Sequence, residues 1–505
     1  MTTFAVKIQL KSINDGAENW KFLDLSFNID KMRMLRYNMK KRKEDRTLKS
    51  MLVKDILKVT NGTLVYGDEN EVCENFSKNT KEINEGDIYI GIKGERFDGS
   101  TFYKEALEQG AKGAIINKNA QIDRTLTQGK FLIEVDDTIE ALTQMATLKR
   151  EQYNIPVIAV TGSVGKTSTK DIIYSVVSEK YNTLKTLGNL NNHIGLPMTI
   201  LRLKDEEALV VEMGMNHFGE ISKLTRIAKP DIAVITNVGT AHIGNLGSRE
   251  NILKAKLEIL EGLSKNGTLV INNDNDLLHK WNKENTKYNV VTYGINNEST
   301  YVAENIEYTE TGSSYTINCD NKEYKVKVPV GGEAFIYNSL SAISVGKILN
   351  IPMQKIIDGI EKFELTKMRL DVTKMKEGYT VINDCYNANY DSMKSSIEYL
   401  KNIDGKRKIA VLGDMLELGD FSQELHEKVG QQVAKNKIDI LITVGTASEF
   451  IAQKAKENGT KCVYNFKNNE EAIEKLQEIL SSGDVVLIKA SNSMKFKEIA
   501  EKIIH

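Results

Sequence analysis

Short apolar runs alternate with amphipathic segments through the middle of the chain. Each apolar run has the length of a strand. Segments with helical periodicity begin at Lys166 and after residues 215–220, and a third covers residues 248–263. Strands without polar alternation, separated by helices, indicate a parallel sheet covered on both faces. Ligands of such sheets bind at the carboxyl ends of the strands. The predicted strands are 157–160 (VIAV), 208–212 (ALVVE), 232–236 (IAVIT), 268–271 (TLVI) and 289–293 (NVVTY).

Two further α/β patterns flank this central one. The first begins with an expected helix at 51–62 and contains the strands GDIYIGI and GAIIN on either side of a helix at 100–111. After a helical stretch near Asn338 to Phe363, strand and helix alternate again, which predicts a second doubly wound domain. Its segments are YTVIND, DSMKSSIEYL, KIAVLGD, DILITVG and DVVLIKAS. The predicted domains are 51–150, 151–365 and 366–505.

The first fifty residues differ from the rest and end in KKRKEDRTLK before Ser50 and Met51. They are interpreted as an N-terminal extension, 1–50, that is a start-site extension or poorly ordered tail, or alternatively a small docking arm.

Composition narrows the class of protein. With 505 residues the chain is too long to fold around a single hydrophobic core, and about three domains are expected. Lys+Arg 68 against Asp+Glu 69 leaves a formal charge of −1, so no global field recruits nucleic acid or a membrane. The four scattered cysteines suggest neither a zinc site nor a disulfide framework. No apolar run of membrane-spanning length and no signal-peptide core are seen, so a cytoplasmic protein is expected.

The segment TGSVGKT, residues 161–167, has the composition of a phosphate-binding loop between a strand and a helix. Gly162 and Gly165 allow backbone N–H groups to converge on phosphate oxygens, and Lys166 neutralises the terminal phosphates. Thr167 supplies a hydroxyl for Mg²⁺. This is the shorter T-G-x-x-G-K-T form of the loop, and it predicts that the central domain is a P-loop ATPase.

Polar residues follow the neighbouring strands at the same expected edge. Glu212 ends one strand, Asn237 and His242 follow the next, and a later helix carries Lys256. Each has a plain alternative: a structural hydrogen bond for Glu212, a satisfied loop histidine for His242, and a solvated helix face with a Lys254–Glu258 pair for Lys256. Their clustering beside a phosphate loop favours a nucleotide site.

Several segments together resemble the Mur ligases over roughly residues 51–505. YNAN followed by DSM, and GDMLELG, favour the branch of the family that acts on D-alanyl-D-alanine. The segments are TGSVGKTSTK, GNLNNHIGLP, VVEMGMNHFGEI, TNVGTAHIGNLGS, AKLEI, INDCYNANYDSM, AVLGDMLELG and KASNSMK.

The resemblance implies an ATP-dependent ligase that joins D-alanyl-D-alanine to UDP-N-acetylmuramoyl-tripeptide through an acyl phosphate in peptidoglycan precursor synthesis. It implies two Mg²⁺ ions, one held by Thr167 and Glu212, the other by His242 and a carbamylated Lys256. A bare lysine is a cation and cannot ligate a metal, whereas its carbon dioxide adduct is an anion. A monomer without nucleic acid or membrane partners is expected.

The resemblance also assigns binding residues. Asn338 is expected beside adenine, although Ala334 and Phe335 stand where the family has a histidine–asparagine pair. Arg369 and Asp384 are expected to close over phosphate and ribose, and Arg369 suits phosphoryl oxygens because its planar fork binds them in pairs. The other expected nucleotide contacts are Thr161, Gly162, Ser163, Val164, Gly165, Lys166, Thr167 and Ser168. The expected substrate contacts are Thr80, Asn189, Asn191, Asn192, Asn387 and Asn389, with Lys166, His242, Lys256 and Arg369 as catalytic residues.

Other interpretations remain open. The asparagines of GNLNNHIG can be ordinary turn residues. A nucleotide-regulated binding protein would use the same loop as a switch without ligation. A sister Mur ligase that adds one amino acid, or a folylpolyglutamate synthase, would share the central loop but lack the YNAN and GDMLELG pair.

Overall fold

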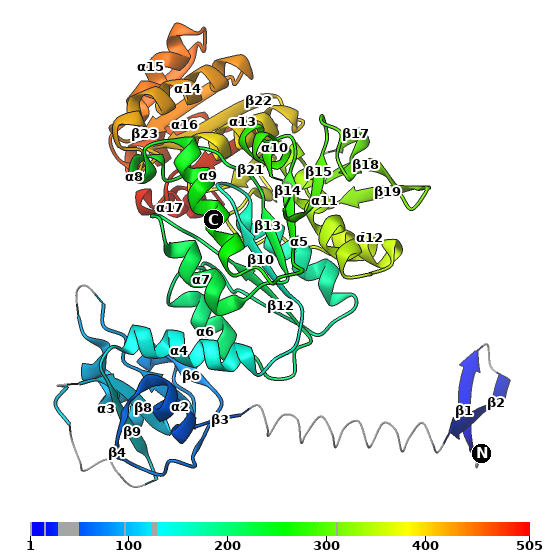
Figure 1. The fold of residues 1–505 in the computed structure, drawn as a ribbon. Helices are drawn as coiled ribbons and strands as arrows, with labels where there is room; N and C mark the ends of the chain where they lie inside the picture. Colours follow the sequence, from blue (N-terminus) through cyan, green and yellow to red (C-terminus); the bar gives the residue numbers. More distant parts are fainter. Residues whose placement is uncertain are drawn as a thin grey trace. The chain divides into compact units, whose positions relative to one another are not determined.

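The computed structural model describes residues 3–14, 17–28, 50–94, 97–118, 120–122, 129–285, 287–309 and 312–504 (Figure 1). The chain forms two compact units. The first unit contains residues 1–138 and 202–205, and the second contains 139–201 and 206–505. Within the second unit we call residues 151–365 the central lobe and residues 366–504 the C-terminal lobe.

A seven-stranded parallel sheet forms the central lobe, in the order β11-β12-β10-β13-β14-β15-β16. Its middle strands are entirely buried, as continuous apolar runs in a parallel sheet require. The strands are β10 (Val157–Thr161), β11 (Thr183–Lys185), β12 (Ala208–Glu212), β13 (Ile232–Ile235), β14 (Thr268–Asn272), β15 (Asn289–Gly294) and β16 (Tyr301–Val302). The helix α4 (Thr138–Glu151) precedes the lobe, whose first helices are α5 (Lys166–Ser178), α6 (Gly195–Leu201), α7 (Glu220–Ala228), α8 (Ile243–Leu246), α9 (Arg249–Leu257), with the short turn η3 (Glu258–Glu261), and α10 (Asp276–Glu284).

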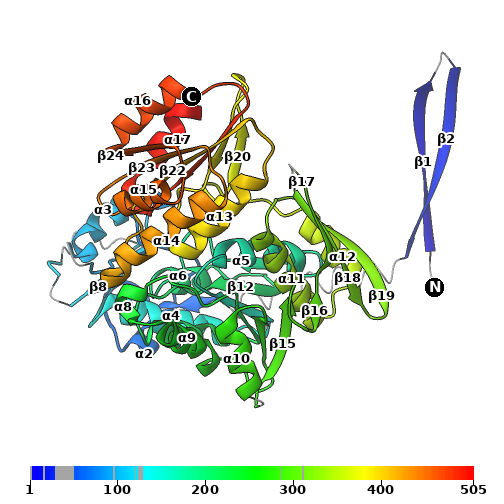
Figure 2. The ribbon, with the colours of Figure 1, turned by 90° about the horizontal axis from the view of Figure 1, so that it is seen from above.

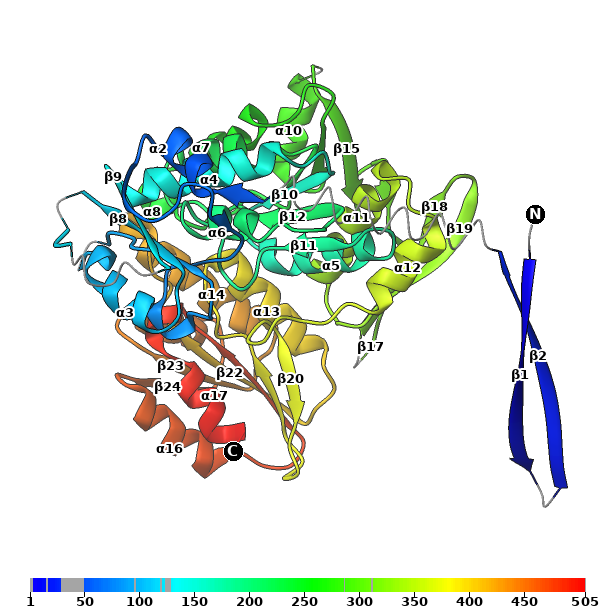
Figure 3. The same cartoon turned by 90° about the horizontal axis from the view of Figure 1, so that it is seen from below.

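The central lobe ends in an antiparallel sheet that the strand–helix pattern does not predict. β17 (Glu304–Thr309), β18 (Gly312–Cys319) and β19 (Lys322–Val328) pair in that order. The helices α11 (Glu333–Ile348) and α12 (Met353–Glu361) contact both this sheet and α5, as Figures 2 and 3 show. This double coverage explains why most of α5 is buried.

The C-terminal lobe is a six-stranded sheet in the order β20-β21-β25-β22-β23-β24, parallel except for β20. The strands are β20 (Asp371–Lys374), β21 (Thr380–Asn383), β22 (Arg407–Gly413), β23 (Ile440–Val444), β24 (Cys462–Phe466) and β25 (Asp484–Lys489). The helices are α13 (Tyr390–Asn402), α14 (Ser422–Lys435), α15 (Ser448–Glu457), α16 (Asn469–Ile479) and α17 (Lys497–Ile504), with the turns η4 (Gly419–Phe421) and η5 (Asn492–Met494).

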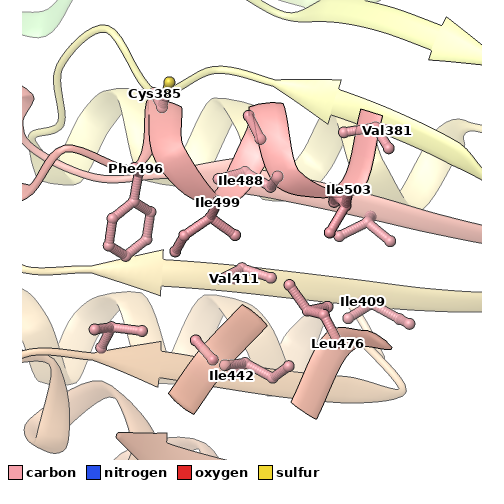
Figure 4. Close-up of a cluster of buried hydrophobic side chains, with 14 of the residues drawn as sticks. Val381, Cys385, Ile409, Val411, Ile442, Leu476, Ile488, Phe496, Ile499 and Ile503 are labelled. Atoms are coloured by element: carbon pink, nitrogen blue, oxygen red, sulfur yellow. The ribbon is translucent and has the colours of Figure 1, made fainter. Parts of the chain in front are cut away.

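Apolar side chains on alternate strand positions build the core of this lobe. Ile409 and Val411 of β22 and Ile488 of β25 meet Ile499 and Ile503 of α17 (Figure 4). Residues of opposite parity, such as Ala410, Leu412 and Leu487, are also buried, so helices cover both faces. The lobe is therefore doubly wound, as predicted.

The first unit is built around the five-stranded sheet β4-β9-β8-β7-β6, in which only β4 runs antiparallel. Among the described residues, no helix is both long and apolar enough to span a membrane. Residues 1–50 contain the antiparallel pair β1 (Thr3–Asn14) and β2 (Ala17–Asn28). The remaining elements are β3 (Met51–Leu52), α2 (Val53–Thr60), β4 (Thr63–Tyr66), β5 (Val72–Cys73), β6 (Phe76–Ser77), η1 (Thr80–Glu82), β7 (Ile88–Ile90), η2 (Gly99–Phe102), α3 (Tyr103–Glu108), β8 (Gly113–Asn117) and β9 (Phe131–Val135).

Candidate active site

A cleft of about 600 Å³ in the second unit brings together most of the predicted site residues. It is lined by the loop after β10, the segment after β12 and loops of the C-terminal lobe. Thr161, Gly162 and Lys256 do not line it, and Thr80 belongs to the first unit. The predicted residues that line it are Ser163, Val164, Gly165, Lys166, Thr167, Ser168, Asn189, Asn191, Asn192, Glu212, His242, Asn338, Arg369, Asp384, Asn387 and Asn389.

The phosphate-loop segment forms the expected tight turn between β10 and α5. Gly162 has a φ of 155°, and a Cβ atom there would collide with Oγ1 of Thr236. Gly165 has a φ of 81°, in the left-handed region that favours glycine. The hydroxyl of Thr161 donates to the carbonyl of Met213 at 2.9 Å, which joins the end of β10 to the segment after β12.

Asn237 braces this loop from the end of β13. The N–H of Ser163 donates to the Asn237 carbonyl at 3.1 Å, and the N–H of Val164 donates to Asn237 Oδ1 at 2.9 Å. The Asn237 amide donates back to the Val164 carbonyl at 3.0 Å. These two loop N–H groups are therefore used internally. The groups suited to an anion are the N–H donors from Gly165 onward, where the first turn of α5 lacks intrahelical acceptors.

Glu212 and Thr167 meet at the centre of the cleft. The Thr167 hydroxyl donates to Glu212 Oε2 at 2.8 Å, and the Asn191 amide donates to Oε1 at 2.8 Å. A hydroxyl beside a carboxylate is the oxygen donor set that Mg²⁺ uses when substrate phosphates complete its coordination. These two residues therefore fit one metal ion. No group of three His, Cys, Asp or Glu side chains with metal-binding geometry occurs among the described residues.

Two cations, Lys166 and Arg369, also line the cleft. Lys166 donates to the carbonyl of Gly162 at 2.9 Å. Burial lowers the pKa of Lys166, Glu212 opposes that shift, and Arg369 adds to it. The Arg369 guanidinium lies over the ring of Tyr386, 4.0 Å from its centroid, and its buried Nε has no acceptor among the described residues. Arg369 lines the cleft, and its planar guanidinium suits an oxyanion ligand.

Lys256 is buried in α9, with only 1% of its surface exposed. Among the described residues no hydrogen bond or ion pair of its amine is found. Burial lowers the pKa of Lys256 well below its usual value, and the charge of Lys166 acts in the same direction. The alternative of a solvated helix face is wrong for Lys256, because the residue is buried. Glu258 accepts hydrogen bonds from the backbone N–H groups of Gly219 and Ser222.

Asn338 lies behind the phosphate loop. Its Oδ1 accepts from the Thr169 hydroxyl at 2.9 Å and lies near Gly165, where an added Cβ would come within 3.2 Å. Ala334 and Phe335, from the turn of α11 before it, also line the cleft. The oxygen of Asn338 is thus occupied, and its amide N–H₂ is the group that it can offer to a ligand.

Asp384 is engaged by its own lobe. Its Oδ2 accepts from Lys489 Nζ at 2.5 Å and from the Ser396 hydroxyl at 2.6 Å, and its Oδ1 accepts from the N–H of Leu370 at 3.2 Å. Lys489 also donates to the carbonyl of Asn387 at 3.2 Å. The pair therefore organises the loop that carries Asn387. Lys489 lines the cleft and had no role assigned from sequence, although it stands in the KASNSMK segment.

The predicted substrate asparagines divide by their contacts. Asn192 Oδ1 accepts from the N–H of Gly195 at 2.8 Å and Asn389 Oδ1 from that of Ser392 at 2.9 Å, so both cap helices. This is the turn chemistry considered for Asn192. Asn191 contacts Glu212, and Asn189 lies beside the Tyr386 hydroxyl. Tyr386 lines the cleft, and only its place in YNAN hinted at a role.

His242 contacts a residue that sequence reasoning did not single out. Its Nδ1 lies 2.7 Å from Oε2 of Glu417, in the loop after β22. The hydrogen bond with His242 lowers the pKa of the Glu417 carboxyl. Glu417 stands inside the GDMLELG segment, yet nothing local in the sequence indicates which residue it meets.

His426 of α14 supports the loop that carries Glu417. Its Nε2 accepts from the N–H of Met415 at 2.9 Å, and its Nδ1 lies 2.7 Å from the carbonyl of Ser422. The ring is completely buried, and burial lowers its pKa. A neutral ring with its proton on Nδ1 satisfies both contacts, whereas a proton on Nε2 would remove the acceptor of the Met415 N–H.

We therefore expect acid to destabilise the C-terminal lobe through His426. Because the folded-state pKa lies below the unfolded value of about 6.5, the unfolded chain takes up the proton first, and stability falls as the pH drops below that value. Thermal unfolding between pH 5 and 8 measures this loss. The variant His426→Gln, which cannot titrate, should lose less stability over the same pH range. Identical pH dependence in both proteins would contradict the assignment.

Comparisons with known proteins place this geometry in context. The sequence matches three family models, described as Mur ligase family, catalytic domain (residues 77–150), Mur ligase middle domain (160–346) and Mur ligase, glutamate ligase domain (368–492). The UDP-N-acetylmuramoyl-tripeptide–D-alanyl-D-alanine ligase of Bacillus subtilis is 37% identical over 456 residues, 90% of this chain and 98% of that protein.

Solved structures agree with the sequence matches. The crystal structure of MurF from Acinetobacter baumannii superposes with a TM-score of 0.81 at 29% identity, covering 90% of this chain and 99% of that one. MurF ligase from Thermotoga maritima in complex with ADP superposes with a TM-score of 0.74 at 30% identity, covering 85% and 96%.

Proposed function

Since this chain belongs to the Mur ligase family, we propose that its cleft joins D-alanyl-D-alanine to UDP-N-acetylmuramoyl-tripeptide at the expense of ATP. The protein is an ATP-dependent ligase of peptidoglycan precursor synthesis, and it forms UDP-N-acetylmuramoyl-pentapeptide, ADP and phosphate. The observation that carries the proposal is the meeting of the phosphate loop, the Thr167–Glu212 pair and Arg369 in one cleft.

The reaction has two steps with different demands on the chain. The terminal carboxylate of the tripeptide attacks the γ-phosphorus of ATP, the bond from that phosphorus to the β–γ bridging oxygen breaks, and ADP leaves. The amino group of D-alanyl-D-alanine then attacks the acyl carbon, loses a proton and expels phosphate. In the first step negative charge spreads over phosphoryl oxygens, so Lys166, Arg369 and the N–H donors at the start of α5 stabilise it by position and field.

We assign the first Mg²⁺ to Thr167 and Glu212, because their oxygens lie 2.8 Å apart at the phosphate loop. We assign a second Mg²⁺ to His242 and carbamylated Lys256. Bound metal would neutralise phosphate charge during transfer. The chain's own part is to hold these ligands in place: Asn191 orients Glu212, and Glu417 contacts His242.

The environment of Lys256 favours its carbamylation. Carbon dioxide reacts only with a neutral amine, and burial together with Lys166 shifts Lys256 toward that form. The product is an anion beside the cation Lys166, so the unfavourable lysine–lysine contact becomes a favourable one. In the part of the chain that the structure describes, this buried amine has no partner, and the modification would supply the missing opposite charge.

The remaining assignments concern binding. Asn338 offers its amide to the adenine side, and Asp384 supports the wall of the nucleotide site through Lys489. We assign Asn189 and Asn191, which line the cleft, to the sugar–peptide substrate. Asn387 and Asn389 are suited to the dipeptide. Thr80, in η1, is proposed to contact the uridine nucleotide.

We propose a monomeric enzyme of the cytoplasm. The nearly balanced charge offers no field for nucleic acid or membranes, and all cysteines in the described residues are free thiols, as in reducing compartments.

We expect the purified chain to release phosphate from ATP only when both UDP-N-acetylmuramoyl-tripeptide and D-alanyl-D-alanine are present, and to form one equivalent of pentapeptide product per phosphate. A coupled phosphate assay with mass spectrometry of the nucleotide product measures both. Single amino acids, each with its matching precursor, serve as control acceptors. Product with a single amino acid but none with the dipeptide would identify a sister ligase, and ATP binding without product would identify a switch.

A further inference from the structure

Two segments of the C-terminal lobe contact residues 239–244, a stretch that contains His242 and the first two residues of α8. At its start, the N–H and hydroxyl of Thr240 both donate to Oδ2 of Asp391, at 2.7 and 2.8 Å. At its end, the N–H of Gly244 donates to the carbonyl of Glu417 at 3.2 Å. Figures 1 and 2 show α8 beside the C-terminal lobe, where it contacts η4.

Two glycines allow this close approach. A Cβ atom on Gly239 would collide with the Asp391 carboxylate, and one on Gly244 would lie 2.6 Å from the backbone nitrogen of Gly419. Neither glycine has a positive φ, so the conformation of the loop itself does not require them. The requirement comes from the docked lobe. These contacts can exist only while the two lobes touch.

The Glu417 carboxylate also determines the state of the His242 ring. An ionised carboxylate can only accept hydrogen bonds, so the proton of the contact lies on Nδ1 of His242. In a neutral ring Nε2 then carries the lone pair. A neutral imidazole without such a partner favours the proton on Nε2, where it would block a cation.

We propose that Glu417 is a positioning residue that holds His242 in the Nδ1–H form, leaving Nε2 to bind a divalent cation, and that it does so only when the C-terminal lobe is docked. The inference rests on the proposed metal role of His242. Docking of the C-terminal lobe would thus decide whether His242 can bind the metal ion. The metal site is complete only when Asp391 and Glu417 of that lobe contact the His242 loop.

The tautomer can be read directly, without substrates. In the full chain labelled with ¹⁵N-histidine, the His242 signals are assigned by their absence from His242→Asn. In spectra recorded at a pH high enough for a neutral ring, we expect a protonated Nδ1 and an unprotonated Nε2 in the wild type, and a shift toward protonated Nε2 in Glu417→Ala. Glu417→Gln should keep the wild-type pattern, because the amide oxygen still accepts from Nδ1–H. Asp391→Ala should shift the pattern partway by loosening the docking.

The metal dependence gives a second readout. In Glu417→Ala the Mg²⁺ concentration for half-maximal turnover should rise by about 10- to 100-fold, the usual cost of losing a partner of a metal ligand. Glu417→Gln should recover most of the wild-type value. Asp420→Ala removes an exposed carboxylate from the same loop and should change neither readout. Melting curves confirm folding of each variant.

An unchanged His242 tautomer in Glu417→Ala would overturn the proposal, as would a Mg²⁺ requirement equal to that of Asp420→Ala. An unchanged tautomer in Asp391→Ala would overturn the coupling to docking. Because the NMR readout needs no ligation, failure of the proposed function is recognised separately, by absent product in the wild type.

Discussion

Lys256→Met is expected to abolish most ligation without weakening the fold. Losing the proposed carbamate should reduce turnover by on the order of 10²–10³-fold, as loss of a preorganised charge at a reacting phosphate does. Stability should change in the opposite sense. In wild-type protein kept free of carbon dioxide, Lys256 is a bare amine whose folded-state pKa lies below its unfolded value, so its burial disfavours folding at neutral pH, and an apolar side chain of similar length removes that cost. The unfolding temperature of Lys256→Met should therefore equal or exceed that of the wild type without carbon dioxide.

The matched control is Lys254→Met, on the same helix but exposed, which should leave turnover and stability nearly unchanged. Short carboxylic acids added to Lys256→Ala should restore part of the lost turnover, because they can occupy the place of the carbamate. Full activity in Lys256→Met would refute the carbamate role. A large drop in its unfolding temperature would instead show that the amine stabilises the fold.

Glu212→Gln should also cost roughly 10²–10³-fold in turnover while keeping the shape of the site. The amide can still accept from Asn191 and exchange a hydrogen bond with Thr167, so only the charge is lost. Two effects follow. The proposed metal loses its carboxylate, and Lys166 loses the neighbour that opposes the burial-driven fall of its pKa. Steady-state rates measured against Mg²⁺ and pH separate these effects.

In Glu212→Gln the Mg²⁺ requirement should rise, and any alkaline loss of activity that reports Lys166 should begin at a lower pH. Glu258→Gln is the matched control, because Glu258 also accepts two hydrogen bonds but lies outside the cleft lining. An unchanged Mg²⁺ requirement in Glu212→Gln would argue against Glu212 as the metal ligand.

The central and C-terminal sheets were predictable because their signal is local. Continuous apolar runs followed by amphipathic segments predict parallel strands whose two faces are covered by helices. The strands β10, β12, β13, β22 and β25 form where those runs lie. The sheet β17–β19 was missed because its alternating strands stand between two stretches of strand–helix pattern. The strand β24 was also missed; it lies at the edge of its sheet and none of its five residues is fully buried.

The candidate site was predictable only in part. The phosphate loop is a contiguous segment, and Glu212 and His242 follow strands that must end at the same edge of the sheet. Other contacts span large separations: Glu417 is 175 residues from His242, and Asp391 is 151 residues from Thr240. Periodicity reports only which face a residue occupies, so it cannot indicate which loop of another lobe will meet it.

By itself, the sequence determined the strand–helix architecture, the phosphate loop and its placement before α5, because backbone geometry and side-chain periodicity act over a few residues. Only the tertiary structure decided that Lys256 is buried without a partner among the described residues, that Asn237 uses two loop N–H groups, and that Asp384 pairs with Lys489. The burial and pairing of a side chain depend on which distant segments pack against it. The local sequence around a helical lysine is the same whether water or a second cation lies next to its amine.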